Sequence, residues 1–124
     1  MRYLIDTNCC IFLFAGGYQA LADRISALDK DEVGLSAIVY AELALGSANG
    51  KEPSPSALDR LIRIFPVLPF DEAAARAYAL LPFKRGSFDR LLAAHALTLD
   101  LTLITNNERD FADIPGLKVE NWTI

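Results

Sequence analysis

Short apolar runs alternate along the chain with longer segments in which apolar residues recur every three or four positions. Short apolar runs bounded by polar residues are typical of buried strands, and the longer spacing is typical of helices with one buried face. Their alternation predicts an α/β domain with a mostly parallel central sheet flanked by helices. The expected strands are Tyr3–Ile5, Val33–Leu35, a brief one within Val67–Phe70, Leu101–Thr105 and one near Leu117–Val119.

Residues typical of helix ends mark the helices between these strands. Ser36 is a suitable N-cap for a helix over Ala37–Leu45, which Gly46 would close. Asp71 would cap another helix ending near Leu81, and the polar stretch Ser47–Ser56 is predicted to be a surface loop. The other helices are expected from Asp6 to Gly16, around Leu21, Ile25 and Leu28, around Leu58, Leu61, Ile62 and Phe65, and over Ser87–Asp100 with Phe88, Leu91, Leu92, His95 and Leu99 on one stripe.

Length and composition indicate one domain over residues 1–124, with ample apolar material for a core, since 52% of the residues are hydrophobic. No apolar run approaches the roughly 18 residues of a membrane span, and the N-terminus does not resemble a secretory signal. We therefore expect a soluble cytoplasmic protein that does not contact a membrane. The adjacent Cys9 and Cys10 suit buried thiols in a reducing compartment better than a disulfide.

The charge balance has to be interpreted locally. Twelve basic residues against 16 acidic ones give a net charge of −4, which disfavours a protein that grips nucleic acid through bulk positive charge. It leaves open an RNA-binding protein whose acidic residues gather at a site filled by cations.

Several acidic and amide residues stand where predicted strands end or where a helix begins. Asp6 follows the first strand, Asn107 follows the strand Leu101–Thr105 with Asp110 about one turn later, and Asp89 opens the helix that leads into that strand. In parallel α/β sheets, ligands bind at the carboxyl ends of the strands. Taken singly, each residue also has an ordinary explanation as a helix cap, a turn residue or a surface charge.

Glu42 is harder to explain as a capping residue because it lies in the middle of its helix. It shares a stripe with Ile38, Ala41 and Leu45, where a buried, unpaired carboxylate would cost several kcal/mol. A bound cation would remove that cost, whereas the alternative is an exposed position on an otherwise buried helix. His95, on the apolar stripe of its own helix, is expected to be a structural histidine outside the site.

Clustered carboxylates are suited to metal-ion catalysis. Mg²⁺ or Mn²⁺ prefers such oxygen ligands, and one or two ions can drive the hydrolysis of a phosphodiester. The sole histidine on an apolar stripe leaves no Ser-His-Asp set, and no glycine-rich phosphate loop follows the first strand.

Four segments, "YLIDTN", "SAIVYAEL", "FDRLLAAHAL" and "LTLITNNERDFADIPGLKVENW", resemble the PIN-domain ribonucleases of the VapC toxin type, in the right order over essentially the whole chain. The resemblance implies a PIN-like three-layer sandwich, a Mg²⁺- or Mn²⁺-dependent endoribonuclease, a cognate antitoxin from the same operon and commonly a homodimer. By motif match, the three core acids are Asp6, Glu42 and Asp89, while Asp110 supplies a fourth charge and Asn107 a hydrogen bond. The residues implied to orient these carboxylates are Thr7, Asn8, Ser36 and Thr105.

The chain departs from this family before the third acid, where the usual stretch contracts to "LLPFKRGSFD", residues 80–89. Lys84, Arg85 and Arg90 cluster there, either as a basic edge for RNA phosphates or as a solvated charged turn. The contraction affects the expected shape of the substrate groove and leaves the acidic positions in place.

Three other functions are weighed against a toxin ribonuclease. A phospho-receiver domain needs a second acid beside Asp6, an aspartate where Ser36 stands and a lysine near Asn106. An Asp-x-Asp phosphatase needs an acid where Asn8 stands. A catalytically inactive PIN scaffold that binds RNA or protein stays open, because a fold alone does not establish activity. For an active enzyme, tRNA is the leading candidate among RNA substrates.

Overall fold

The computed structural model describes residues 1–83 and 87–124. At its centre lies a five-stranded sheet in the order β3-β2-β1-β4-β5, in which every neighbouring pair is parallel. This confirms the expected α/β class. The strands are β1 (Tyr3–Ile5), β2 (Val33–Ser36), β3 (Val67–Leu68), β4 (Thr102–Ile104) and β5 (Val119–Glu120).

Helices occupy the connections between the strands. They are α1 (Thr7–Ala15), α2 (Gln19–Ser26), α3 (Ala37–Ala48), α4 (Pro55–Ile64), α5 (Glu72–Ala79) and α6 (Phe88–Leu99), with the short 3₁₀ helices η1 (Lys30–Glu32) and η2 (Glu108–Phe111). None of the helices in the described part of the chain combines the length and the apolar character that crossing a membrane requires.

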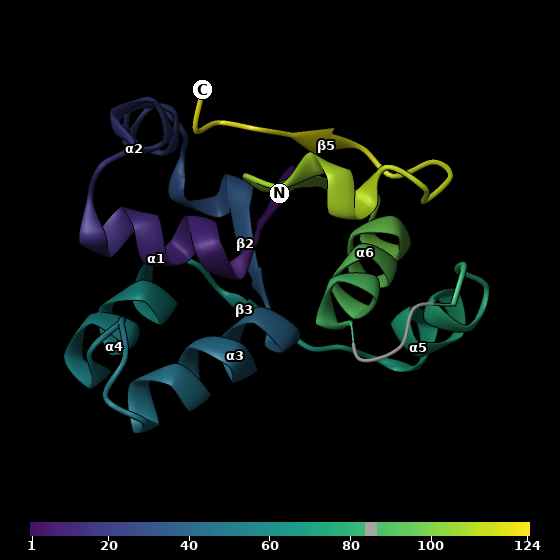
Figure 1. Ribbon diagram of the computed structural model, residues 1–124, viewed down its shortest axis with the longest axis horizontal. Helices are drawn as coiled ribbons and strands as arrows, with labels where there is room; N and C mark the ends of the chain where they lie inside the picture. The colour runs from purple at the N-terminus through teal and green to yellow at the C-terminus, as the bar shows by residue number, and fades with distance from the viewer. Residues whose placement is uncertain (84–86) are drawn as a thin grey trace.

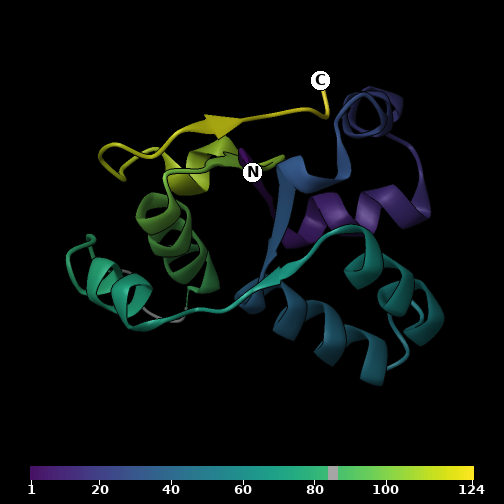
Figure 2. The ribbon, with the colours of Figure 1, turned by 180° about the vertical axis from the view of Figure 1, so that it is seen from behind.

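The strand order reverses at β1, and this reversal separates the helices into two layers. From β1 the chain steps to β2 and β3, and then returns past β1 to β4. Because crossovers between parallel strands are right-handed, a change in the direction of stepping moves the connecting helices to the opposite face. Figures 1 and 2 show α1 to α4 grouped on one side and α5 with α6 on the other.

The two central strands carry the most deeply buried side chains. Leu4 and Ile5 of β1 and Leu103 and Ile104 of β4 have no exposed surface. Other fully buried core residues come from both helix layers and include Cys9, Cys10, Leu21, Val39, Ala93 and Ala96. The two cysteines are free thiols, as the sequence predicted.

Helix α3 is longer than its sequence indicated. It passes through Gly46 to Ala48, and Asn49 is its C-cap. Gly50, with φ of 76°, adopts the left-handed conformation typical of a glycine just beyond a helix end, whereas Gly46, expected to close the helix, lies inside it. The predicted loop is correspondingly shorter, because Ser54 already caps α4.

The buried centre of the sheet should dominate stability. We expect Leu4→Ala to lower the free energy of unfolding by about 2–5 kcal/mol, the usual cost of a buried Leu→Ala change. Leu80 is 87% exposed, so Leu80→Ala should change it by no more than about 0.5 kcal/mol. Urea denaturation of the two variants measures the difference, and equal losses would contradict this assignment of the core.

Candidate active site

The site begins where β1 and β4 end side by side. Ile5 and Ile104 are register partners, and the Asp6 amide donates to the Ile104 carbonyl at 3.0 Å. Asp6 and Thr105, the next residues on each strand, therefore lie together at the carboxyl edge of the sheet. This is the point where the strand order reverses, the usual ligand-binding position in open α/β sheets.

Asp6 caps a helix and also lines a cleft. Its Oδ1 accepts from the Cys9 amide at 2.8 Å and so caps α1. Burial raises the pKa of Asp6, while hydrogen bonds with Thr105 and Cys9 act in the opposite direction. These bonds fix the carboxylate at the base of the cleft, so capping and site formation are compatible.

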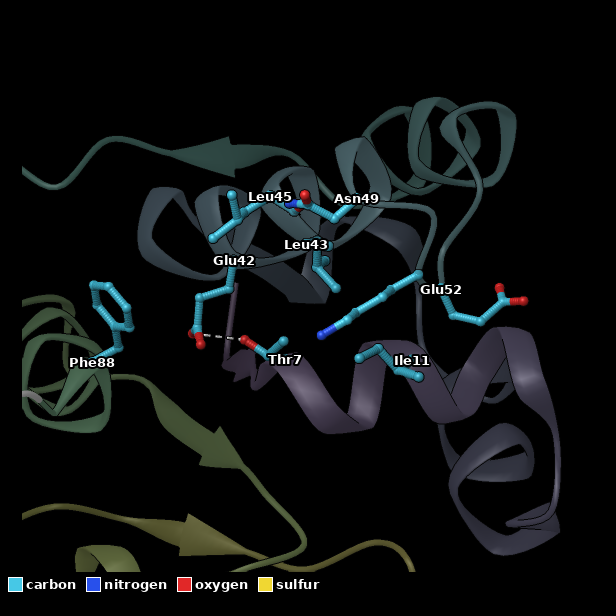
Figure 3. Close-up of a pocket in the computed structure, with 10 residues that line it drawn as sticks. Thr7, Ile11, Glu42, Leu43, Leu45, Asn49, Glu52 and Phe88 are labelled. Carbon is cyan, nitrogen blue, oxygen red and sulfur yellow. Dashed lines mark hydrogen bonds between the residues drawn. The ribbon is translucent and has the colours of Figure 1, made fainter.

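Glu42 reaches the same cleft, although the surroundings predicted for it were wrong. The core face of α3 is formed by Val39 and Leu43, whereas Ala41 and Leu45 are exposed. Glu42 is half-buried and accepts a hydrogen bond from the Thr7 hydroxyl on α1 at 2.9 Å, as Figure 3 shows.

Asp89 faces the other acids from the opposite helix layer. The N-cap of α6 is Ser87, so Asp89 lies in the first turn and is not the cap. Its pKa is raised, first by burial, then by the negative charges of Asp110 and Glu42, by a hydrogen bond with Asp110 and by the charge of Asp6. The four predicted carboxylates therefore interact with one another through Asp89.

Asn107 is hydrogen-bonded to the fourth acid, since its Nδ2 donates to Asp110 Oδ2 at 2.8 Å. This bond holds the Asp110 carboxylate at the start of η2. The backbone amide of Asn107 in turn donates to the Thr105 hydroxyl at 3.1 Å. The turn after β4 is therefore tied to the residue that contacts Asp6.

Three of the four acids line a small cleft, whose walls are formed by Asp6, Thr7, Asn8, Glu42, Asp89 and Leu92. Within residues 1–83 and 87–124, no three acidic, histidine or cysteine side chains already converge closely enough to hold one metal ion. Carboxylates without a counter-ion repel one another, which opposes such convergence. The donor set, all oxygen and all anionic, suits a hard cation such as Mg²⁺ or Mn²⁺.

Two of the four residues expected to orient the carboxylates contact one, namely Thr7 and Thr105. Asn8 is exposed at the rim of the cleft. Ser36 differs from the expectation. Its hydroxyl bonds to the Ile38 amide and to the ring of His95, not to an acid.

One of the three residues predicted to form a basic edge beside Asp89 is not at the surface. Arg90 is only 4% exposed, and its Nη2 donates to Asp113 Oδ2 at 2.9 Å. The first turn of α6 packs against the segment after η2, which buries the guanidinium and makes it unavailable to RNA. Lys84 and Arg85 lie outside the described residues.

An apolar groove of about 520 Å³, which the sequence did not reveal, adjoins the cleft. Thr7 and Glu42 line both, and Figure 3 shows Phe88 and Glu52 at opposite ends of the groove. Phe88 and Leu45 had been placed on core-facing stripes, yet both are exposed. The signal in the sequence that could have indicated a surface groove was the apolar stripe on α3, which Glu42 interrupts with a carboxylate.

Comparisons with known proteins show what the chain is similar to. The family model described as "PIN domain" matches residues 3–117. The chain is 35% identical to Ribonuclease VapC1 of Haemophilus influenzae over 99% of both proteins, and 30% identical to the tRNA(fMet)-specific endonuclease VapC of Salmonella typhimurium over 98% of both. Its fold is similar to that in the crystal structure of VapBC2 from Rickettsia felis bound to promoter DNA, with a TM-score of 0.87, 30% identity and coverage of 98% and 99%.

The raised pKa of Asp89 predicts a pH-dependent stability without metal. Between its unfolded pKa, about 3.9, and the higher folded value, the folded state binds more protons than the unfolded state, so stability falls as pH rises through this window. In EDTA at pH 7, Asp89→Asn should therefore raise the melting temperature by a few degrees. The gain should shrink on acidification and vanish below the unfolded pKa.

Thermal unfolding of wild type and variant from pH 8 to pH 4 measures this gain. Asp59→Asn, at an exposed carboxylate on α4, is the control and should show no comparable pH-dependent gain. A gain for Asp89→Asn that persists unchanged to pH 4 would contradict the electrostatic explanation.

Proposed function

Because the chain belongs to the PIN-domain family and, within it, to the VapC ribonucleases, we propose that it is a Mg²⁺- or Mn²⁺-dependent endoribonuclease acting as the toxin of a toxin–antitoxin pair. The observation that carries the proposal is the electrostatic influence of three carboxylates on a fourth, Asp89, near the edge of the sheet where its strand order reverses. Such a concentration of negative charge is costly without a cation and chemically useful with one.

The residues that would hold the metal are Asp6, Glu42, Asp89 and Asp110. When bound, the ion would activate a water for attack on a phosphodiester and stabilise the leaving oxygen. The chain supplies the orientation of the ligands: Thr7 holds Glu42, Thr105 contacts Asp6 and Asn107 holds Asp110.

RNA is the proposed substrate, with tRNA as the first candidate. Support comes from related proteins in Shigella flexneri and Salmonella typhimurium, which are named tRNA(fMet)-specific endonucleases. The homodimer implied by the family resemblance stays a prediction.

The partner would be an antitoxin that covers the acidic cleft. Solved relatives include the VapBC complexes of Rickettsia felis and Salmonella typhimurium. The apolar groove would take an apolar segment of the antitoxin, and its junction with the cleft at Glu42 would favour a lysine or arginine on that segment.

Removing a proposed ligand should remove cleavage. We expect Asp6→Asn and Asp89→Asn to reduce RNA cleavage in Mn²⁺ by more than the roughly 10–100-fold that losing an outer partner of a metal site costs. Glu72→Gln, which changes an exposed carboxylate on α5, is the control and should cleave normally. Total RNA incubated with Mn²⁺ or EDTA, followed by sequencing of the cut ends, measures activity and identifies the substrate. A folded wild type that cleaves nothing in Mn²⁺ would favour the inactive scaffold.

If the antitoxin covers the acidic cleft, the acids also contribute to antitoxin binding. Glu42→Gln should weaken the complex with the antitoxin encoded beside the toxin by roughly 30-fold or more, because losing one partner of a buried charge pair costs about 2–5 kcal/mol. Leu45→Glu should also weaken it by placing a charge on the apolar wall, and Glu72→Gln should not. Calorimetric titration gives the dissociation constants. Unchanged affinity of both groove variants would place the antitoxin elsewhere.

A further inference from the structure

A buried hydrogen bond joins the two halves of the cleft. Ser36 Oγ lies 2.8 Å from His95 Nδ1, and the two residues are 0% and 1% exposed. Ser36 ends β2 and caps α3, the helix of Glu42, while His95 lies on α6, the helix of Asp89. Among the described residues, this is the side-chain hydrogen bond that connects α6 with the β2–α3 segment.

The surroundings of the ring determine which atom donates. The ring also forms a hydrogen bond with the backbone of Pro69, and proline has no N–H, so the ring must donate to the carbonyl. Burial lowers the pKa of His95, against the opposing effects of the Asp71 charge and the Pro69 bond, which keeps the ring neutral at pH 7. With one ring nitrogen protonated toward Pro69, Nδ1 is left to accept the Ser36 proton.

Ser36 has the complementary arrangement. Its oxygen accepts from the Ile38 amide at 3.1 Å, in the first turn of α3, so its own proton is available to His95. The edge of the ring also packs on Phe70, with centroids 5.5 Å apart. Each polar atom of the two side chains thus has an assigned partner, and Ser36 Oγ has two, which fixes their relative position.

The pair lies close enough to the acids to control their spacing. Ser36 precedes Glu42 by six residues and His95 follows Asp89 by six, so each acid is about 9 Å along its helix from the bond. A shift of α6 against α3 at this bond would change the separation of Asp89 from Glu42. Because these carboxylates repel each other, an attractive contact nearby opposes the separation of their helices.

We propose that His95 is a positioning residue for the acidic cleft: by accepting the Ser36 proton, it holds the helix of Asp89 against the helix of Glu42 at the spacing that metal binding requires. The inference rests on the proposed metal-dependent nuclease. His95 itself contacts neither the metal nor the RNA.

Two variants of His95 that are isosteric with each other, Leu and Asn, test the role of the ring nitrogen as a hydrogen-bond acceptor. Asn and Leu have the same branching, and Asn Oδ1 is as many bonds from Cα as His95 Nδ1. We expect His95→Leu to weaken Mn²⁺ binding by roughly tenfold, the lower end of the effect of outer-shell changes, and His95→Asn to restore most of the loss. Electron paramagnetic resonance of free Mn²⁺ gives the dissociation constants without reference to activity. His95→Leu should also lower kcat at limiting Mn²⁺, with recovery at high Mn²⁺ and an unchanged KM for RNA.

Ser36→Ala and Ser54→Ala form the matched control pair, because both remove a hydroxyl that caps a helix. Both should lower thermal stability, but only Ser36→Ala should weaken Mn²⁺ binding. This pair decides the question should His95→Leu not fold. The inference would be overturned if Ser36→Ala and Ser54→Ala bound Mn²⁺ equally well, or if His95→Leu and His95→Asn weakened Mn²⁺ binding equally. With an active wild type, either result would leave the proposed function standing. A wild type that neither binds Mn²⁺ nor cleaves RNA would overturn both.

Discussion

The parallel pairing of β1 with β4 is the constraint on which the cleft depends. With Ile5 opposite Ile104, Asp6 and Thr105 emerge at the same level of the sheet and face each other. A slip of one residue would exchange the side chains that face the two helix layers and move Asp6 out of level with Thr105. The return of the chain from β3 to β4 also has to cross the opposite face of the sheet, so α6 brings Asp89 toward Glu42 from the other helix layer. One register and one reversal thus bring together residues more than 80 positions apart.

The fold carries an electrostatic cost at this place and offsets it locally. Burial raises the pKa of both Asp89 and Asp6; neighbouring negative charges add to the rise at Asp89, whereas hydrogen bonds with Thr105 and Cys9 oppose it at Asp6, the more buried of the two. Each of the other two acids also receives a neutral donor, Glu42 from Thr7 and Asp110 from Asn107. Neutral donors orient a carboxylate and leave its charge in place, whereas an arginine or lysine would neutralise it. The cleft therefore retains its attraction for a cation.

The sequence predicted the strands, the helices and the nearness of Asp6, Glu42 and Asp89 well, because each depends on local signals: apolar runs, caps and polar residues at strand ends. It failed where the outcome depends on distant neighbours. Helix α3 is apolar on nearly all sides, so its periodicity could not show that Val39 and Leu43, not Ala41 and Leu45, face the core. Arg90 was placed at the surface because its partner, Asp113, lies 23 residues away. Ser36 and His95, 59 residues apart, could not be paired from spacing alone.

Glu42 connects the two recesses of the protein, since it lines both the acidic cleft and the apolar groove. Its hydrogen bond from Thr7 lies at their junction. A ligand in the groove that donates to Glu42 competes with a cation in the cleft for the same carboxylate. Binding free energies are reciprocal, so any factor by which such a ligand lowers metal affinity is also the factor by which the metal lowers affinity for the ligand. Under the proposed function, inhibition and metal loading would be two sides of one equilibrium, and a single side chain in the middle of a helix would couple them.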